Sequence, residues 1–179
     1  MKTTTMKKII AILVLMVVGT GVYAQGDAIT KFFTKYATDE TFTTATISSK
    51  MFSLITNMDV ENEDDKAIVE AISKLKGLKV LGKENTSDAR SLYKEAFALV
   101  GKDYEELMAV RDEDRDMKFF IRESGGKISE LLMVMGGKDD FMLLSLFGEI
   151  DLKQISRIGR KMNVSGLEKL EKIGDKKKD

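Results

Sequence analysis

The sequence predicts a single α+β domain, built mainly on an antiparallel sheet with a C-terminal β-meander and helices packed on it. Two observations support this prediction. Residues 116–151 contain three apolar runs separated by Gly- and Asp-rich turns at 124–127 and 136–140, which is the pattern of consecutive hairpins. Elsewhere, apolar residues recur at helical spacing, and no proline, linker-like stretch or repeat divides the chain.

The first 24 residues have the pattern of a secretory signal peptide. Three lysines precede an apolar run at 9–18, and residues 22–24 form an A-x-A-like cleavage site before Gln25. The run is shorter than the roughly 20 residues of a membrane-spanning helix, so cleavage is favoured over a retained anchor. The absence of cysteine excludes a cysteine-linked lipid anchor and disulfide bonds. We expect a mature domain over 25–163 that carries no membrane span.

Before the meander, helical and extended segments alternate. Apolar residues at helical spacing predict a short helix at 26–36. The segment 41–50 is dense in β-branched residues and predicts a strand. Residues 51–58 fit either a short helix or a continuation of that strand.

Further along, the helix signals become stronger. Residues 61–76 predict a helix, because Asn62 can cap its start, acidic residues follow the cap and lysines lie at its end. Residues 77–83 alternate in polarity and predict a short strand. A second helix is predicted at 87–100, with Ser87 as its N-cap.

Segments on both sides of the meander complete the domain. Residues 104–111 fit a strand or a helix, and their place just before the meander favours a strand. After the meander, apolar residues at helical spacing behind the potential cap Asp151 predict a final helix at 151–161 that packs on the sheet. Residues 164–179 are predicted to be a loosely held charged tail.

The middle strand of the meander, 127–135, is apolar on both faces. Because successive side chains of a strand alternate, one face receives Ile128, Glu130, Leu132 and Val134, and the other receives Ser129, Leu131, Met133 and Met135. Leu132 and Val134 are predicted to be core. The second face needs either covering helices or a partner, since large exposed apolar patches usually mark interaction sites. The candidate interaction face comprises Met133, Met135, Met142 and Leu144.

The composition argues against nucleic acid as a partner. Basic and acidic residues number 29 each, and removal of the signal would take away lysines only. The mature chain is therefore slightly acidic, whereas phosphate binding requires a concentrated basic surface. The basic cluster at 176–178 lies at the end of the chain and is typical of a solvated tail.

Missing residue types restrict the possible chemistry. The chain has no histidine and no cysteine, which removes Ser-His-Asp and Cys-His catalysis, the usual zinc sites and thiol redox chemistry. The adjacent pairs Ser49-Lys50 and Ser73-Lys74 lack the S-x-x-K spacing of a Ser-Lys dyad.

Metal sites receive little support as well. The acidic runs at 59–65 and 112–116 lack the central glycine and distal glutamate of an EF-hand loop, and we interpret them as a helix N-terminus and a turn. Met133 and Met135 are soft ligands that Cu(I) would accept, but packing is the commoner role of methionine. No catalytic residue, metal or cofactor is predicted.

Several segments resemble the family known as domain of unknown function 4252. They are 47–52 (ISSKMF), 75–81 (LKGLKVL), 104–108 (YEELM), and, in and after the meander, 120–122 (FIR) and 148–152 (GEIDL). The resemblance covers nearly the whole mature chain. It implies a small exported protein of the Gram-negative envelope, periplasmic or secreted, with one domain, and it assigns no catalytic or binding residue.

Two hypotheses for function follow. The first is an exported, non-enzymatic interaction module that binds an envelope protein or a small ligand, because catalytic residue types are missing and the sheet is apolar on both faces. The alternative is a periplasmic hydrolase or ligand carrier that uses carboxylates. An interaction module needs an exposed apolar groove or strand edge, whereas an enzyme needs convergent polar groups in a pocket. The oligomeric state is left open.

Overall fold

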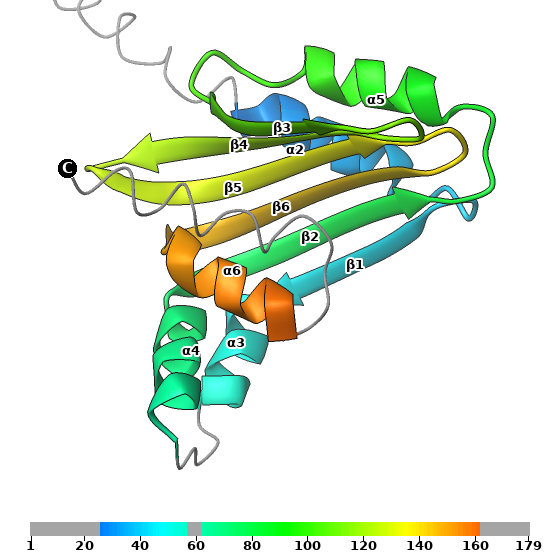
Figure 1. Ribbon diagram of the computed structural model, residues 1–179. Coiled ribbons are helices and arrows are strands. Elements are labelled where there is room, and N and C mark those ends of the chain that lie inside the picture. The colour runs from blue at the N-terminus through cyan, green and yellow to red at the C-terminus, as the bar shows by residue number, and fades with distance from the viewer. Residues whose placement is uncertain (1–25, 57–61, 162–179) are drawn as a thin grey trace, which may run out of the picture.

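The computed structural model describes residues 26–56 and 62–161, which form a six-stranded antiparallel sheet and five helices (Figure 1). In their order across the sheet, the strands are β1 (Thr43–Ser48), β2 (Leu75–Lys83), β6 (Phe141–Ile150), β5 (Lys127–Gly136), β4 (Asp116–Ser124) and β3 (Glu105–Arg111). The helices are α2 (Gly26–Tyr36), α3 (Ser49–Thr56), α4 (Glu63–Ser73), α5 (Ala89–Ala98) and α6 (Leu152–Lys161). The predicted α+β class and the C-terminal meander are confirmed. The predicted signal peptide at 1–24 and tail at 164–179 lie outside the described residues.

Helices cover both faces of the sheet. On the first face, α2 and α5 contribute Phe32 and Leu92 to a core that also contains Leu132 and Val134 of β5 (Figure 1). On the second face, α3 and α6 contribute to a separate core with the methionines of the sheet, and the members supplied by these two helices are Phe52, Leu152 and Ile155. The two-sided apolar pattern of β5 is therefore explained, because this strand lies between two cores.

Local sequence signals place most helix and turn ends correctly. The side chains of Asn62 and Asp151 each accept a hydrogen bond from a backbone N–H in the first helical turn, at 3.0 and 2.9 Å, as expected of N-caps. Gly125 and Gly126 have φ angles of 61° and 75°, the left-handed backbone that a two-residue hairpin turn requires. The ambiguous segment after β1 is a helix, α3.

Two predicted boundaries are corrected. The α4 helix ends at Ser73 instead of running to 76, because β2 already begins at Leu75, where it pairs with the end of β6. Ser87 is not the cap of α5, which begins at Ala89. The hydroxyl of Thr86 accepts the Asp88 N–H at 3.2 Å and so orders the loop before the helix.

A β-bulge at the start of β5 changes one predicted face. The register against β6 shifts between Ile128 and Glu130, so strict alternation fails at Ser129. The prediction that Ile128 shares a face with Leu132 is wrong, because Ile128 packs with the core of the second face. From Glu130 onward the predicted alternation holds, and Leu132 and Val134 are fully buried, as expected.

The last strand of the sheet pairs with the first half of the chain. Gly148 of β6 has φ 137°, and a Cβ at this position would lie 2.5 Å from the carbonyl oxygen of Lys74. The N–H of Glu149 donates to that same oxygen at 3.1 Å. A glycine is therefore required where β6 passes the junction between α4 and β2.

Candidate interaction surface

The four residues predicted as an interaction face lie together on the second face. Met135 is the cross-strand partner of Met142, and Met133 is that of Leu144. Met133 and Met135 are buried, at 4% and 7% exposed, whereas Met142 and Leu144 are half-buried. All four share an apolar cluster with Leu152 of α6, so these side chains contribute mainly to the core.

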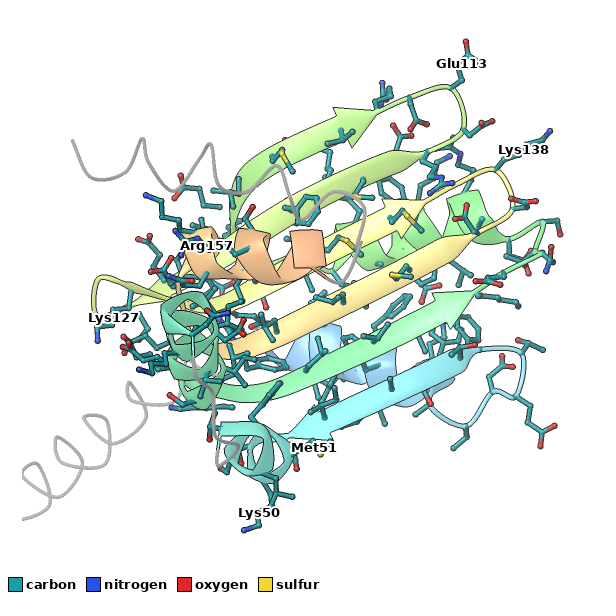
Figure 2. All side chains as sticks on the ribbon, turned by 60° about the horizontal axis from the view of Figure 1, so that its bottom comes forward. Lys50, Met51, Glu113, Lys127, Lys138 and Arg157 are labelled. Carbon is teal, nitrogen blue, oxygen red and sulfur yellow. The ribbon has the colours of Figure 1, made fainter. Side chains whose placement is uncertain are left out.

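One edge of the sheet, β1, is open to another strand. It is hydrogen-bonded to β2 alone, and Figure 2 shows no other described strand along its outer side. The sequence of β1 is TTATIS, without a charge, and five of its six residues are exposed. Its pairing with β2 runs from Thr43 to Ser48 without a register shift. Within the part of the chain that the structure describes, its outward backbone donors and acceptors therefore have no strand partner, which is the condition for pairing with another chain.

The opposite edge, β3, is protected against such pairing. Its register with β4 shifts between Glu106 and Met108, and the strand carries the charged residues Glu105, Glu106 and Arg111. Charges and bulges are the usual devices that block edge-to-edge association. The β3 edge therefore resists pairing with another strand, whereas the β1 edge has neither a charge nor a bulge to prevent it.

Ion pairs hold the charges of the protected edge in place. Lys118 Nζ lies 2.6 Å from the Glu106 carboxylate. Arg111 and Arg90 each lie 2.5 Å from an oxygen of Asp116. The hydrogen bonds from Arg111 and Arg90 hold the pKa of Asp116 below its ordinary value, so this carboxylate remains ionised at neutral pH.

Exposed apolar side chains border the open edge. The α3 helix follows β1 directly, and its Met51 and Leu54 are 49% and 54% exposed. Lys50 and Met51 lie beside the end of β1 (Figure 2). We call this combination of strand edge and helix, residues 43–54, the β1–α3 surface. The sequence indicates the strand, but its edge position depends on the strand order, which no local pattern indicates.

A cleft of about 570 Å³ lies between α4, α6 and the ends of β5 and β6. Its charged side chains pair with one another, since Lys74 lies 2.8 Å from Glu70 and Lys127 lies 2.6 Å from Glu149. The other described carboxylates that line it also take part in contacts. The buried Oε1 of Gln154 has no hydrogen-bond partner among the described atoms. The described carboxylates of the cleft therefore have structural partners, and the unpaired oxygen of Gln154 is buried.

One carboxylate is fully buried on the first face. Glu130 is 1% exposed, its Oε1 accepts from the Ser145 hydroxyl at 2.5 Å, and its Oε2 accepts from Arg122. Arg122 also lies 3.4 Å from Asp103 and 5.2 Å from the ring centre of Tyr104. Burial, reinforced by the charge of Glu130, raises the pKa of Tyr104, so its phenol stays protonated. Because each group is paired, we interpret this cluster, hereafter the Glu130 cluster, as structural.

The described residues also lack two further kinds of feature. They contain no group of three or more acidic side chains placed to hold a metal ion. In the same part of the chain, no helix has the length and apolar character needed to cross a bilayer.

Comparison with known proteins identifies a family. The model of a domain of unknown function, DUF4252, matches residues 36–158, from the end of α2 into α6, and so includes every strand of the sheet. No curated protein and no solved structure matches the chain. The chain therefore belongs to the DUF4252 family, as its sequence segments suggested.

Proposed function

We propose that this protein is an exported, non-enzymatic protein-binding module of the Gram-negative envelope, and that it binds through the β1–α3 surface. The main observation that supports this proposal is the contrast between the two edges of the sheet. One edge has charges and a bulge, whereas the other is uncharged, regular and open. A partner that adds an extended segment to β1 gains backbone hydrogen bonds, and Met51 and Leu54 supply apolar contacts beside it.

The residue types support binding over catalysis. The whole chain lacks histidine and cysteine, and Glu130 is the one fully buried carboxylate among the described residues. Its two oxygens are bonded by Ser145 and Arg122, which leaves it poorly suited to proton transfer. The cleft carboxylates are likewise engaged. The alternative of a small-ligand carrier is favoured by one observation, the cleft of about 570 Å³ between α4, α6 and the ends of β5 and β6.

Export is tested by the N-terminus of the mature protein. Lysines followed by an apolar run and a small-residue cleavage site at 22–24 support removal of the first 24 residues. We expect N-terminal sequencing of the periplasmic fraction to begin at Gln25. Recovery of the chain in the membrane fraction with Met1 retained would contradict this expectation.

Binding through β1 is tested by a charge in the middle of its open edge. Ala45→Asp is expected to reduce crosslinking of the mature protein to its envelope partner by roughly tenfold, because an added strand would have to desolvate the new carboxylate. Ala109→Asp is the matched control, since Ala109 is also exposed but lies on the protected edge strand β3. Equal loss in both variants would contradict a role for β1.

A further inference from the structure

We infer that the segment that pairs with β1 is β1 of a second copy, so that two chains join their sheets into one antiparallel sheet. This inference rests on the proposed function, since it names the occupant of the same surface. Three features support this pairing: the symmetry of strand pairing, the side chains along β1, and the charges at its two ends.

Symmetry restricts the possible registers. Two copies that join edge to edge are related by a two-fold axis perpendicular to the sheet, so each residue faces one whose side chain points to the same side. Because side chains alternate along a strand, two facing residues must both be odd-numbered or both be even-numbered, so their numbers add to an even number. With Ala45 on the axis, the smallest side chain of the strand faces itself, and Thr44 faces Thr46 of the second copy. Cross-strand threonine pairs are favourable in antiparallel sheets.

The charges that flank β1 select this same register. Glu40 lies in the turn before the strand and Lys50 lies in the first turn of α3 after it, and both are exposed. Neither forms an ion pair with another described residue. Pairing centred on Ala45 places the turn that carries Glu40 of each copy beside the start of α3, which carries Lys50 of the other. A register centred on Thr46 would slide the two strands by about 7 Å relative to each other and place Thr46, in place of the smaller Ala45, on the axis.

The turn that carries Glu40 is ordered. The N–H and hydroxyl of Thr41 both donate to Asp39 Oδ1, at 2.9 and 2.7 Å. These bonds hold the pKa of Asp39 below its ordinary value, so the turn keeps an ionised carboxylate on the acidic side of β1. In the dimer, Met51 and Leu54 of each copy lie near this turn of the other, so the apolar part of the surface is also used.

The expected dimer is weak and reversible. Two six-residue strands share roughly six backbone hydrogen bonds, an interface near or below the size of ordinary stable complexes. Sedimentation equilibrium is therefore best measured at concentrations of the mature protein from about 5 µM to 1 mM. We expect a monomer–dimer equilibrium within it, and Ala45→Asp is expected to shift the equilibrium to monomer, because like charges then face each other on the axis.

Complementary charge reversal tests the register. Glu40→Lys and Lys50→Glu are each expected to weaken self-association by roughly tenfold, since each places two like-charged pairs at the ends of the interface. An equimolar mixture of the two variants is expected to recover wild-type association, because every end contact then joins opposite charges. About 20 Å of strand separates positions 40 and 50 within one chain, so recovery requires contact between chains. Circular dichroism checks that the variants are folded.

The outcomes separate this inference from the proposed function. A dimer that Ala45→Asp abolishes and the mixture restores supports pairing through β1. A protein that remains monomeric throughout the range, or a dimer insensitive to these variants, overturns the inference. If the protein is monomeric but still crosslinks to an envelope partner in an Ala45-dependent manner, the proposed function stands with a different occupant of β1.

Discussion

Leu132→Asp is expected to destabilise the domain by at least about 4 kcal/mol, a large part of the stability of an ordinary small domain. Leu132 is 0% exposed in β5, and its cross-strand partners are Phe120 and Ser145. Neither partner can neutralise a new carboxylate. Glu130, two residues away on the same face, adds a like charge. The introduced group would therefore be a buried, unpaired anion.

A urea titration measures this loss, either as a lower midpoint or as the absence of a cooperative transition. Val134 is equally buried but less suitable, because its cross-strand partner is Lys118, which could pair with the new charge. Ala109→Asp is the control, and its cost is expected to stay within about 1 kcal/mol because Ala109 is exposed. A Leu132→Asp protein with the wild-type midpoint would show that the assigned face of β5 is wrong.

Local signals in the sequence were sufficient to predict the helices and strands of the fold. The helix caps Asn62 and Asp151 and the left-handed glycines 125 and 126 act within a few residues, so their effect is visible in the chain itself. The alternation of β5 was also predictable from Glu130 to the end of the strand. Before Glu130, the bulge at Ser129 changes the face of Ile128, and a bulge depends on how two strands pair.

The order of the strands in the sheet could not be predicted from local sequence patterns. β2 lies between β1 and β6, so the last strand of the meander pairs with a strand that precedes it by about sixty residues. This nonlocal pairing makes β1 an edge, and an uncharged strand such as TTATIS becomes a candidate docking surface only through that position. The methionine face was a reasonable prediction from parity, but α3 and α6 contribute to a shared core there.

The Glu130 cluster could not be predicted from the sequence either. The sequence placed Glu130 on the core side of its strand, and a glutamate among apolar residues is itself a signal that a buried partner exists. Its partners, however, come from three other places: Arg122 on β4, Ser145 on β6 and the loop residue Tyr104. Only the assembled sheet brings them together.

The Glu130–Arg122 pair is expected to respond unequally to loss of either member. Their side chains are 2% and 27% exposed, respectively. Arg122→Met leaves the carboxylate buried with only the neutral donors Ser145 and Tyr104, and is expected to cost about 3–5 kcal/mol. Glu130→Gln keeps an acceptor for Ser145 and lets Arg122 turn toward Asp103 and solvent, so a loss of about 1–3 kcal/mol is expected.

A double-mutant cycle in urea separates this pair from simple packing loss. Because the second substitution removes a group that the first has already left without its partner, the double variant is expected to lose less stability than the two single variants combined, by about 1–3 kcal/mol. Additive costs would mean that the two side chains do not act as a pair in solution. Equal costs for the single variants would contradict the assignment of Glu130 as the more deeply buried charge, since the penalty for an unpaired ion grows with its removal from water.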